Sequence, residues 1–309
     1  MSKSEHVGVE LVAWDEAGPD SAGDRPQLSV ADQGANLVLG AAELGRNLAD
    51  GQGLGPVHAR TLRLRAVLDL VSRLRDLQVP SGAPWPGHEY VRGWGVFGLP
   101  FASGHVLALR VFPENDFAPY RTLWHRDPAG RWSIHVDGPR LDTACPRYYG
   151  SACESTGFAR IDLTWTGPAS LRVLVDSPSL EWTLTASEPR YLRVLNAIGP
   201  RLPMWTWRHE ALLRPRERLA HWLGAGDLKL SGVMPSGHVG TLMPQRMYFI
   251  DESQATLDGV DLGQPTRSDT NPSIGGVPLP ARGILAIGQA AWEILDPAEY
   301  ERTRSLALG

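Results

Sequence analysis

Two histidines, an aspartate and an arginine lie on one face of the hairpin that residues 120–137 are predicted to form. They are His125, His135, Asp137 and Arg121. A histidine beside a carboxylate can act as a general acid or base, because its unperturbed pKa lies near neutrality. Arg121 would then contribute to substrate binding. This chemistry requires that the face look into a cavity, and the alternative is the exposed polar face of a half-solvated sheet.

The hairpin is predicted from its turn. The tetrapeptide DPAG at 127–130 has Asp first, Pro second and Gly last, which are the preferences of a type I turn closed by a left-handed glycine. The flanks alternate and are rich in Trp, Ile, Val, Thr and Tyr, as is typical of strands. If Asp127 pairs with Arg131, the register follows and one face is apolar. The predicted pairs are Trp124 with Ile134, Thr122 with Val136, Arg126 with Trp132, His125 with Ser133, Leu123 with His135, and Arg121 with Asp137.

Two carboxylates in later strands are candidate catalytic acids. Asp162, in RIDLTW, alternates with apolar residues, so an apolar core would place it on the opposite side with Arg160. In a barrel with a polar lumen that side is inside, where an enclosed carboxylate has a raised pKa and can protonate an alkene. The alternative is a surface carboxylate that pairs with Arg160 or Arg172. Glu181, in LEWTLT, has the same two interpretations.

Four of the eleven tryptophans are candidates for the wall of an apolar pocket. A tryptophan ring carries a large apolar area and one polar group, and its face can stabilise a carbocation. Ordinary core packing is the alternative for each of them. The candidates are Trp124, Trp165, Trp205 and Trp207.

The sequence predicts neither a metal site nor a bound cofactor. Cys145 and Cys153 are eight residues apart with no second pair, so two buried thiols are expected rather than a zinc site. The acidic stretch LDGVDLG at 257–263 lacks the calcium-loop pattern and indicates a turn. No Walker motif, dinucleotide fingerprint, GxSxG or HExxH occurs.

The composition is that of a globular protein without a nucleic-acid partner. The chain has 309 residues, of which 42% are hydrophobic and 21% charged, enough for a full core. A net charge of −4 creates no general field that would attract polyanions. The N-terminus lacks an apolar signal core and no window approaches 18 uninterrupted apolar residues, so we expect a cytoplasmic protein without an integral membrane segment.

The sequence predicts a mainly β protein of the α+β class. Its strands would form either an antiparallel lipocalin-like barrel or two packed β units, with a helical N-terminal segment and a helical insertion. Residues 59–77 carry leucines and valines at helical spacing, so this helix would dock on the core or on a second subunit in a homodimer. Within the insertion, Pro215 is expected to begin a second helical piece, and 289–295 are expected to form a short helix. The segments are a poorly ordered tail (1–35), a helical segment (36–80), a first β unit (88–187), a helical insertion (188–226), a second β unit (227–295) and a tail (296–309).

The succession GHVLALRVFP, YRTLWHRDPAGRWSIHVD and RIDLTWTGPASLRVLV resembles a lipocalin-like β unit. Over residues 90–290 it is similar to the carotenoid 1,2-hydratase and hydroxyneurosporene synthase group of two-barrel proteins. The resemblance rests on strand order and aromatic placement, and it matches no catalytic motif. It implies hydration or cyclisation of an apolar, isoprenoid-like substrate that begins with protonation of a double bond. The helical stretches at 36–77 depart from a plain two-barrel chain.

Three functions are consistent with these observations. The first is a cofactor-independent hydratase, cyclase or isomerase that acts on a small lipophilic molecule, with Asp162, Glu181 or Asp137 as the acid and His125 or His135 as its partner. The second is a non-catalytic protein that binds a lipophilic ligand. The third is a structural or interaction protein. An enclosed carboxylate with a perturbed pKa would favour the enzyme, and a filled barrel without a cavity would favour the third function.

Overall fold

A computed structural model describes residues 68–74, 77 and 81–308 of the chain. The expected tail at 1–35, the predicted helix at 36–50 and most of the predicted helix at 59–77 lie outside the described residues. Of the last, the structure describes α2 (Leu70–Leu74), whose Leu70 is fully buried.

Most strands belong to one sheet, and a separate pair, β12 (Ser273–Ile274) and β13 (Val277–Pro278), forms a small hairpin. The strands of the large sheet are β1 (His88–Pro100), β2 (Val106–Asn115), β3 (Tyr120–Arg126), β4 (Trp132–Asp137), β5 (Ser155–Phe158), β6 (Ile161–Trp165), β7 (Ser170–Val175), β8 (Leu180–Ser187), β9 (Ser231–Val233), β10 (Val239–Leu257), β11 (Val260–Asp261) and β14 (Ile284–Glu293).

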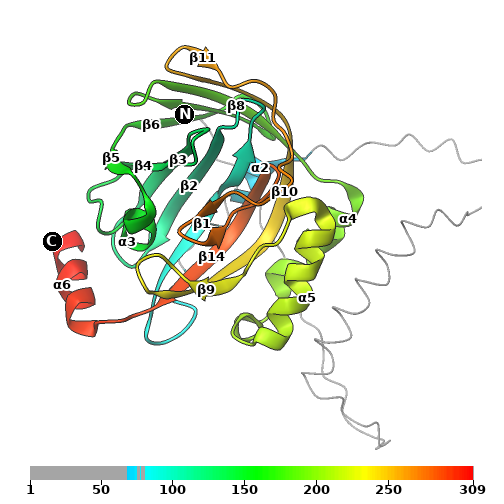
Figure 1. The fold of residues 1–309 in the computed structure, drawn as a ribbon. Coiled ribbons are helices and arrows are strands. Elements are labelled where there is room, and N and C mark those ends of the chain that lie inside the picture. The colour runs from blue at the N-terminus through cyan, green and yellow to red at the C-terminus, as the bar shows by residue number, and fades with distance from the viewer. Residues whose placement is uncertain (1–67, 75–76, 78–80, 309) are drawn as a thin grey trace, which may run out of the picture.

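The large sheet curls into a half-barrel, as Figure 1 shows. Its strand order is β5-β4-β3-β2-β1-β14-β10-β8-β7-β6, and β9 and β11 pair with β10. Because β1 lies beside β14 and β8 beside β10, the two expected β units share one continuous sheet. The mainly β prediction is confirmed, and the half-barrel is consistent with a barrel-like fold, although β4 and β5 pair in parallel where antiparallel strands were expected.

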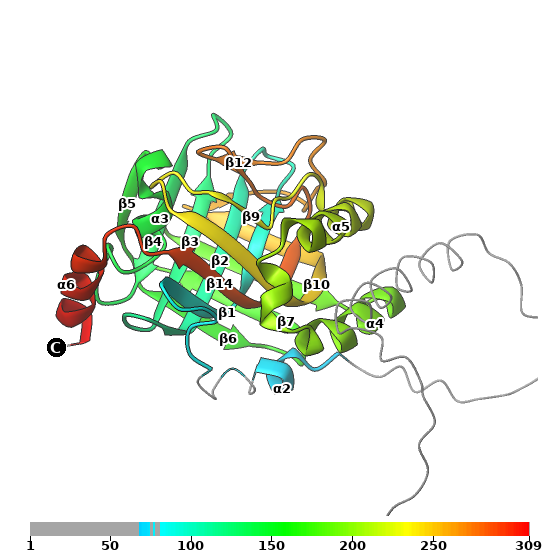
Figure 2. The same ribbon diagram turned by 90° about the horizontal axis from the view of Figure 1, so that it is seen from below.

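The helices lie around the rim and one side of this sheet. The described helices of the insertion, α4 (Arg190–Ile198) and α5 (Glu210–Ala220), lie along β10, and α6 (Pro297–Leu308) lies on the opposite side of the molecule (Figure 1). Short helical turns follow α4 and α5, and α3 (Pro146–Tyr149) lies in the connection after β4. Figure 2 shows α2 against the side of the sheet where β6 and β7 run.

Two local predictions were wrong. The helix α5 continues through Pro215, which is its sixth residue, so the missing N–H removes only one internal hydrogen bond near the start of the helix. Residues 289–293 continue β14 instead of forming a helix, because they pair on both edges, with β1 and with β10. Tertiary pairing overrides the local helical preference here.

The predicted hairpin forms with the predicted register. Asp127 and Arg131 close the turn through a backbone hydrogen bond of 3.0 Å from the Asp127 N–H to the Arg131 carbonyl, and Gly130 takes a φ of 92°. All six expected residue pairs between β3 and β4 are present. The turn therefore sets which side chains share a face.

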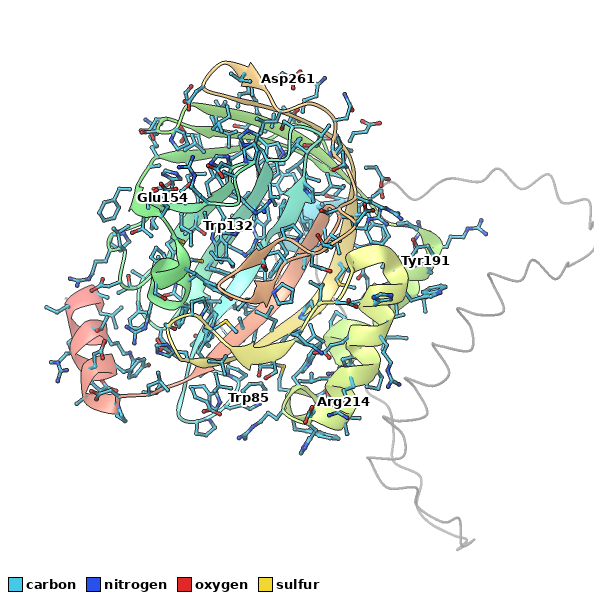
Figure 3. All side chains as sticks on the ribbon, viewed as in Figure 1. Trp85, Trp132, Glu154, Tyr191, Arg214 and Asp261 are labelled. Atoms are coloured by element: carbon cyan, nitrogen blue, oxygen red, sulfur yellow. The ribbon has the colours of Figure 1, made fainter. Side chains whose placement is uncertain are left out.

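The two faces of the curled sheet bury separate cores. Inside the curl, Leu107, Leu123, Ile161 and Trp182 belong to one apolar cluster that side chains from β6, β7 and β8 complete. On the outer face of β2, β3 and β4, Trp132 belongs to a second cluster, which α3 and the β12–β13 hairpin cover. Figure 3 shows Trp132 within the molecule, whereas Glu154, Arg214 and Asp261 lie at its periphery.

An ion pair on the hairpin helps the sheet to curl back on itself. The Asp137 carboxylate lies 3.4 Å from Nη1 of Arg121 and accepts a hydrogen bond of 3.2 Å from the Ile161 N–H. Nη1 of Arg121 also donates to the Ile161 carbonyl at 2.7 Å. Arg121 and Asp137 therefore join β3 and β4 to the first residue of β6, on the far edge of the sheet.

Candidate functional site: an apolar cavity on the outer face of the sheet

A cavity of ≈ 100 Å³ lies on the outer face of β1, β2 and β14. Its floor contains Gly93, Gly288, Ala286 and Ala290, which project at most a methyl group from the sheet. At Gly288, an added Cβ would lie 2.2 Å from the Met243 carbonyl oxygen, so only glycine fits the close approach of β14 and β10 there.

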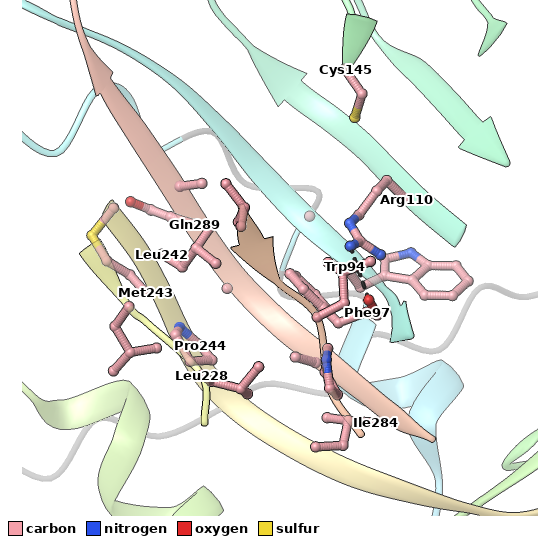
Figure 4. Close-up of a pocket in the computed structure, with 18 of the residues that line it drawn as sticks. Trp94, Phe97, Arg110, Cys145, Leu228, Leu242, Met243, Pro244, Ile284 and Gln289 are labelled. Carbon is pink, nitrogen blue, oxygen red and sulfur yellow. Dashed lines mark hydrogen bonds between the residues drawn. The ribbon is translucent and has the colours of Figure 1, made fainter. Parts of the chain in front are cut away.

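The walls and the roof of the cavity come from distant parts of the chain. Figure 4 shows Arg110 and Cys145 on one side of the drawn residues and Met243 and Pro244 on the other. The roof is formed by residues next to β13 and by α3, and Trp132 holds β12 in place through a hydrogen bond of 2.7 Å from its Nε1 to the Ser273 carbonyl. Lining residues beyond the floor include Phe97, Phe112, Trp124, Tyr148, Tyr149, Leu228, Leu242, Met247, Leu279 and Trp292.

Arg110 is the one buried cation among the described residues that line the cavity. Only 4% of the residue is exposed, and its guanidinium stacks over the ring of Phe97, 4.0 Å from the centroid, and near that of Trp124 at 4.9 Å. It donates hydrogen bonds to the carbonyls of Val96, of Phe97 at 3.2 Å and of Leu109 at 3.1 Å. No carboxylate of the described residues forms an ion pair with it. The other lining cation, Lys229, is exposed and pairs with Glu217.

The groups near Arg110 are neutral at physiological pH. Burial raises the pKa of the Cys145 thiol above its ordinary value, despite a hydrogen bond from Thr122 and the Arg110 charge. Burial likewise raises the pKa values of the Tyr120 and Tyr149 hydroxyls. Burial lowers the pKa of Arg110 to about 10, which still leaves the guanidinium charged at pH 7. Within the described part of the chain, the Arg110 guanidinium is therefore a positive charge in the cavity wall with no carboxylate beside it.

A buried ionic cluster around Glu89 contacts Tyr148, a residue of the cavity roof. Glu89, which is fully buried, accepts hydrogen bonds from Arg147 Nε at 2.8 Å and from the Tyr148 hydroxyl at 3.0 Å. His238 Nε2 lies 3.2 Å from the same carboxylate, and the Tyr148 ring stacks on Trp292 with centroids 3.8 Å apart. Tyr148 and Trp292 both line the cavity, so Glu89 fixes two of its lining residues.

The predicted catalytic histidines lie on the inner side of the hairpin, away from the cavity. His125 Nε2 lies 2.8 Å from Nδ1 of His105, and the two rings stack with centroids 5.1 Å apart. Burial, followed by the neighbouring His105, lowers the pKa of His125 to about 4, and burial lowers that of His135. These histidines are neutral at pH 7, and Asp137 is engaged with Arg121 as described above.

The two candidate acids Asp162 and Glu181 lie on the outer surface. The Asp162 side chain is 51% exposed, and its carboxylate lies 3.1 Å from Nε of Arg160. The Glu181 side chain is 56% exposed and lies 2.9 Å from Nη2 of Arg172. The apolar residues of β6 and β8, not the polar ones, point into the curl. Neither carboxylate is enclosed as the acid-catalysis hypothesis requires.

One of the four predicted wall tryptophans, Trp124, lines the cavity. Trp165 packs inside the curl, 5.6 Å from the ring of Trp94. Trp207 is buried outside the cavity under the guanidinium of Arg216, and Trp205 is 40% exposed. The structure therefore does not bring the predicted site residues together around one space.

Sequence reasoning missed Arg110 and the glycine floor. Two signals were present: an arginine inside the otherwise apolar run HVLALRVFP, and glycines on both sides of Trp94 in RGWGVFG. An apolar run without alternation is typical of a strand that is buried on both faces, which places the guanidinium in the interior.

Among the described residues, no group of three or more His, Cys, Asp and Glu is arranged to hold a metal ion. None of the helices within the described part of the chain has the length and apolar character needed to cross a membrane. Comparison with protein-family models, with curated proteins and with solved structures finds no match to this chain.

Proposed function

We propose that this protein binds a small lipophilic molecule in the cavity between the outer face of the sheet and its roof. The observation that carries the proposal is the floor of glycine and alanine beneath aromatic and aliphatic walls, which leaves ≈ 100 Å³ unfilled. Protein interiors are packed to crystal density, and an apolar void costs stability unless something occupies it. Binding sites for small molecules have this apolar and mostly enclosed character.

Binding is favoured over acid catalysis by the chemistry of the lining. No Asp, Glu or His is among the described residues that line the cavity, so no general acid of the predicted kind faces a bound molecule. The hydratase or cyclase hypothesis would need Asp162 or Glu181, which lie outside. We therefore place the lipophilic-ligand binding protein first and keep the cofactor-independent enzyme as a hypothesis that the lining does not support.

A cavity-filling variant tests the proposal. Ala286 lines the floor and is 4% exposed, so Ala286→Leu places three further carbons in the space that a ligand would use. We expect 1-butanol at ten times its Kd to stabilise the native protein by about 1.4 kcal/mol, which a denaturation curve can resolve. The same ligand should leave the Ala286→Leu variant unchanged.

The matched control is Ala298→Leu, the same change at an exposed position in α6. This variant should respond to the ligand as the parent protein does. Equal stabilisation of the Ala286→Leu variant, or no stabilisation of the parent protein by any probe, would refute binding in this cavity.

A further inference from the structure

The carbonyl contacts of Arg110 have a structural explanation. The pairing of β1 is irregular after Val96, because its register shifts there against both neighbouring strands. Such a bulge leaves backbone carbonyls without partners in the ladder. Arg110 donates to the carbonyls of Val96 and Phe97 at that point. A neutral donor could satisfy these carbonyls equally well, so the bulge explains the hydrogen bonds and leaves the charge unexplained.

The charge of Arg110 is only partly compensated. A buried cation loses much of its hydration free energy, and an aromatic face returns only part of it. The rings of Phe97 and Trp124 supply this partial compensation. The nearby Cys145 thiol is uncharged, and no carboxylate of the described residues pairs with the guanidinium. An anion entering the cavity would supply the missing compensation.

The guanidinium also retains donors for that anion. Of its five N–H groups, the three carbonyls take two on Nη1 and one on Nη2. Nε–H and the second Nη2 hydrogen have no acceptor among the described residues. The planar guanidinium presents neighbouring N–H groups that match the two oxygens of a carboxylate.

We propose that Arg110 binds the carboxylate of a small apolar carboxylic acid whose hydrocarbon part occupies the cavity. This inference rests on the proposed function and names its ligand class. The volume limits the size: a 150 Å³ cavity admits benzene, so ≈ 100 Å³ fits an acid with about four or five carbons. The apolar walls exclude a second charged group.

Butyrate and 1-butanol, titrated by calorimetry or ligand-observed NMR at pH 7.5, test the inference on the unmodified protein. Each probe has four carbons, and the two differ in the charge of the head group. Because a hydrogen bond to a charged partner is worth about 1.5–3 kcal/mol, butyrate should bind roughly 10- to 100-fold more tightly than 1-butanol. Acetate, which lacks the apolar chain, should bind more weakly than butyrate.

Two variants separate charge from packing. Arg110→Met should abolish the preference for butyrate over 1-butanol, whereas Arg110→Lys should keep a preference for the acid. If Arg110→Met does not fold, the comparison of the two probes on the parent protein and on Arg110→Lys still decides.

The outcomes distinguish the inference from the proposed function. Equal affinity for butyrate and 1-butanol would overturn the role of Arg110 and leave lipophilic binding intact. Absence of binding by either probe would overturn both. A preference for butyrate that survives in Arg110→Met would assign the anion to a different residue and would also overturn the inference.

Discussion

Glu89 is expected to be the most sensitive carboxylate for the stability of the cavity roof. Its side chain is 1% exposed and engages Arg147, Tyr148 and His238 at 2.8, 3.0 and 3.2 Å. Glu89→Gln keeps the shape and removes the charge, so that Arg147, which is 10% exposed, loses its ion-pair partner. Breaking a buried pair from one side costs about 3 kcal/mol or more. At about 2–4 °C per kcal/mol, the melting temperature should fall by roughly 6–12 °C.

The pH dependence of this effect has a definite sign. Burial would raise the Glu89 pKa, but hydrogen bonds from His238, Arg147 and Tyr148 and the Arg147 charge lower it below its ordinary value of 4.5. A lowered folded-state pKa stabilises the native protein above pH 4.5, and this contribution is lost as the pH falls through the folded-state pKa. The stability difference between the parent protein and Glu89→Gln should therefore shrink below about pH 4.5.

The assay is urea denaturation at pH 7 and at pH 3.5, with Glu181→Gln as the matched control. Glu181 is 56% exposed and pairs with Arg172 at the surface, so its change should cost less than about 1 kcal/mol. A Glu89→Gln protein within about 1 kcal/mol of the parent at pH 7, or an equal difference at both pH values, would refute the reasoning.

Three further predictions follow from the remaining groups. Folding lowers the pKa of His125 from 6.5 to about 4, so its contribution to stability is present above pH 6.5 and is lost as the pH falls from 6.5 to 4. The urea midpoint of His125→Gln should therefore vary less over that pH window than the midpoint of the exposed control His209→Gln. An equal pH dependence of the two midpoints would contradict the burial argument. Cys145 is 4% exposed and burial raises the pKa of its thiol, so it should react slowly in the native protein. In a Cys153→Ser protein at pH 8, its reaction with a disulfide reagent should be at least tenfold slower in the native than in the unfolded state, and equal rates would contradict its burial. Asp162→Asn should change the affinity for 1-butanol, measured by calorimetry, less than twofold, because Asp162 lies outside the cavity; a larger loss would return it to the candidate site.

Local chemistry made the hairpin predictable from the sequence. The DPAG turn determines the register of β3 and β4 through contacts only a few residues apart, so all six pairs could be derived. The placement of Asp162 could not be derived in the same way. Alternation separates the two faces of β6 but does not say which face the curl encloses, and the apolar face with Ile161 was enclosed.

The cavity could not be derived because its parts meet only in the folded sheet. Gly93 and Gly288 become neighbours when β1 pairs with β14, although they lie far apart in the chain. The roof over them comes from α3 and from the residues beside β13. Arg110 was recognisable as an arginine in an apolar strand, but its partners are the carbonyls of a bulge in β1, which the sequence does not reveal.

Methyl NMR of methionine-labelled protein tests the central claim, occupation of this cavity by a lipophilic molecule, most directly. Met243 and Met247 line the cavity, whereas Met204 does not line it and packs against the apolar cluster that contains Met243, so it serves as a more distant comparison. Titration with 1-butanol and with butyrate should shift the Met243 and Met247 methyl signals saturably and shift that of Met204 less. Unchanged Met243 and Met247 signals at a concentration that saturates binding by calorimetry would contradict the account.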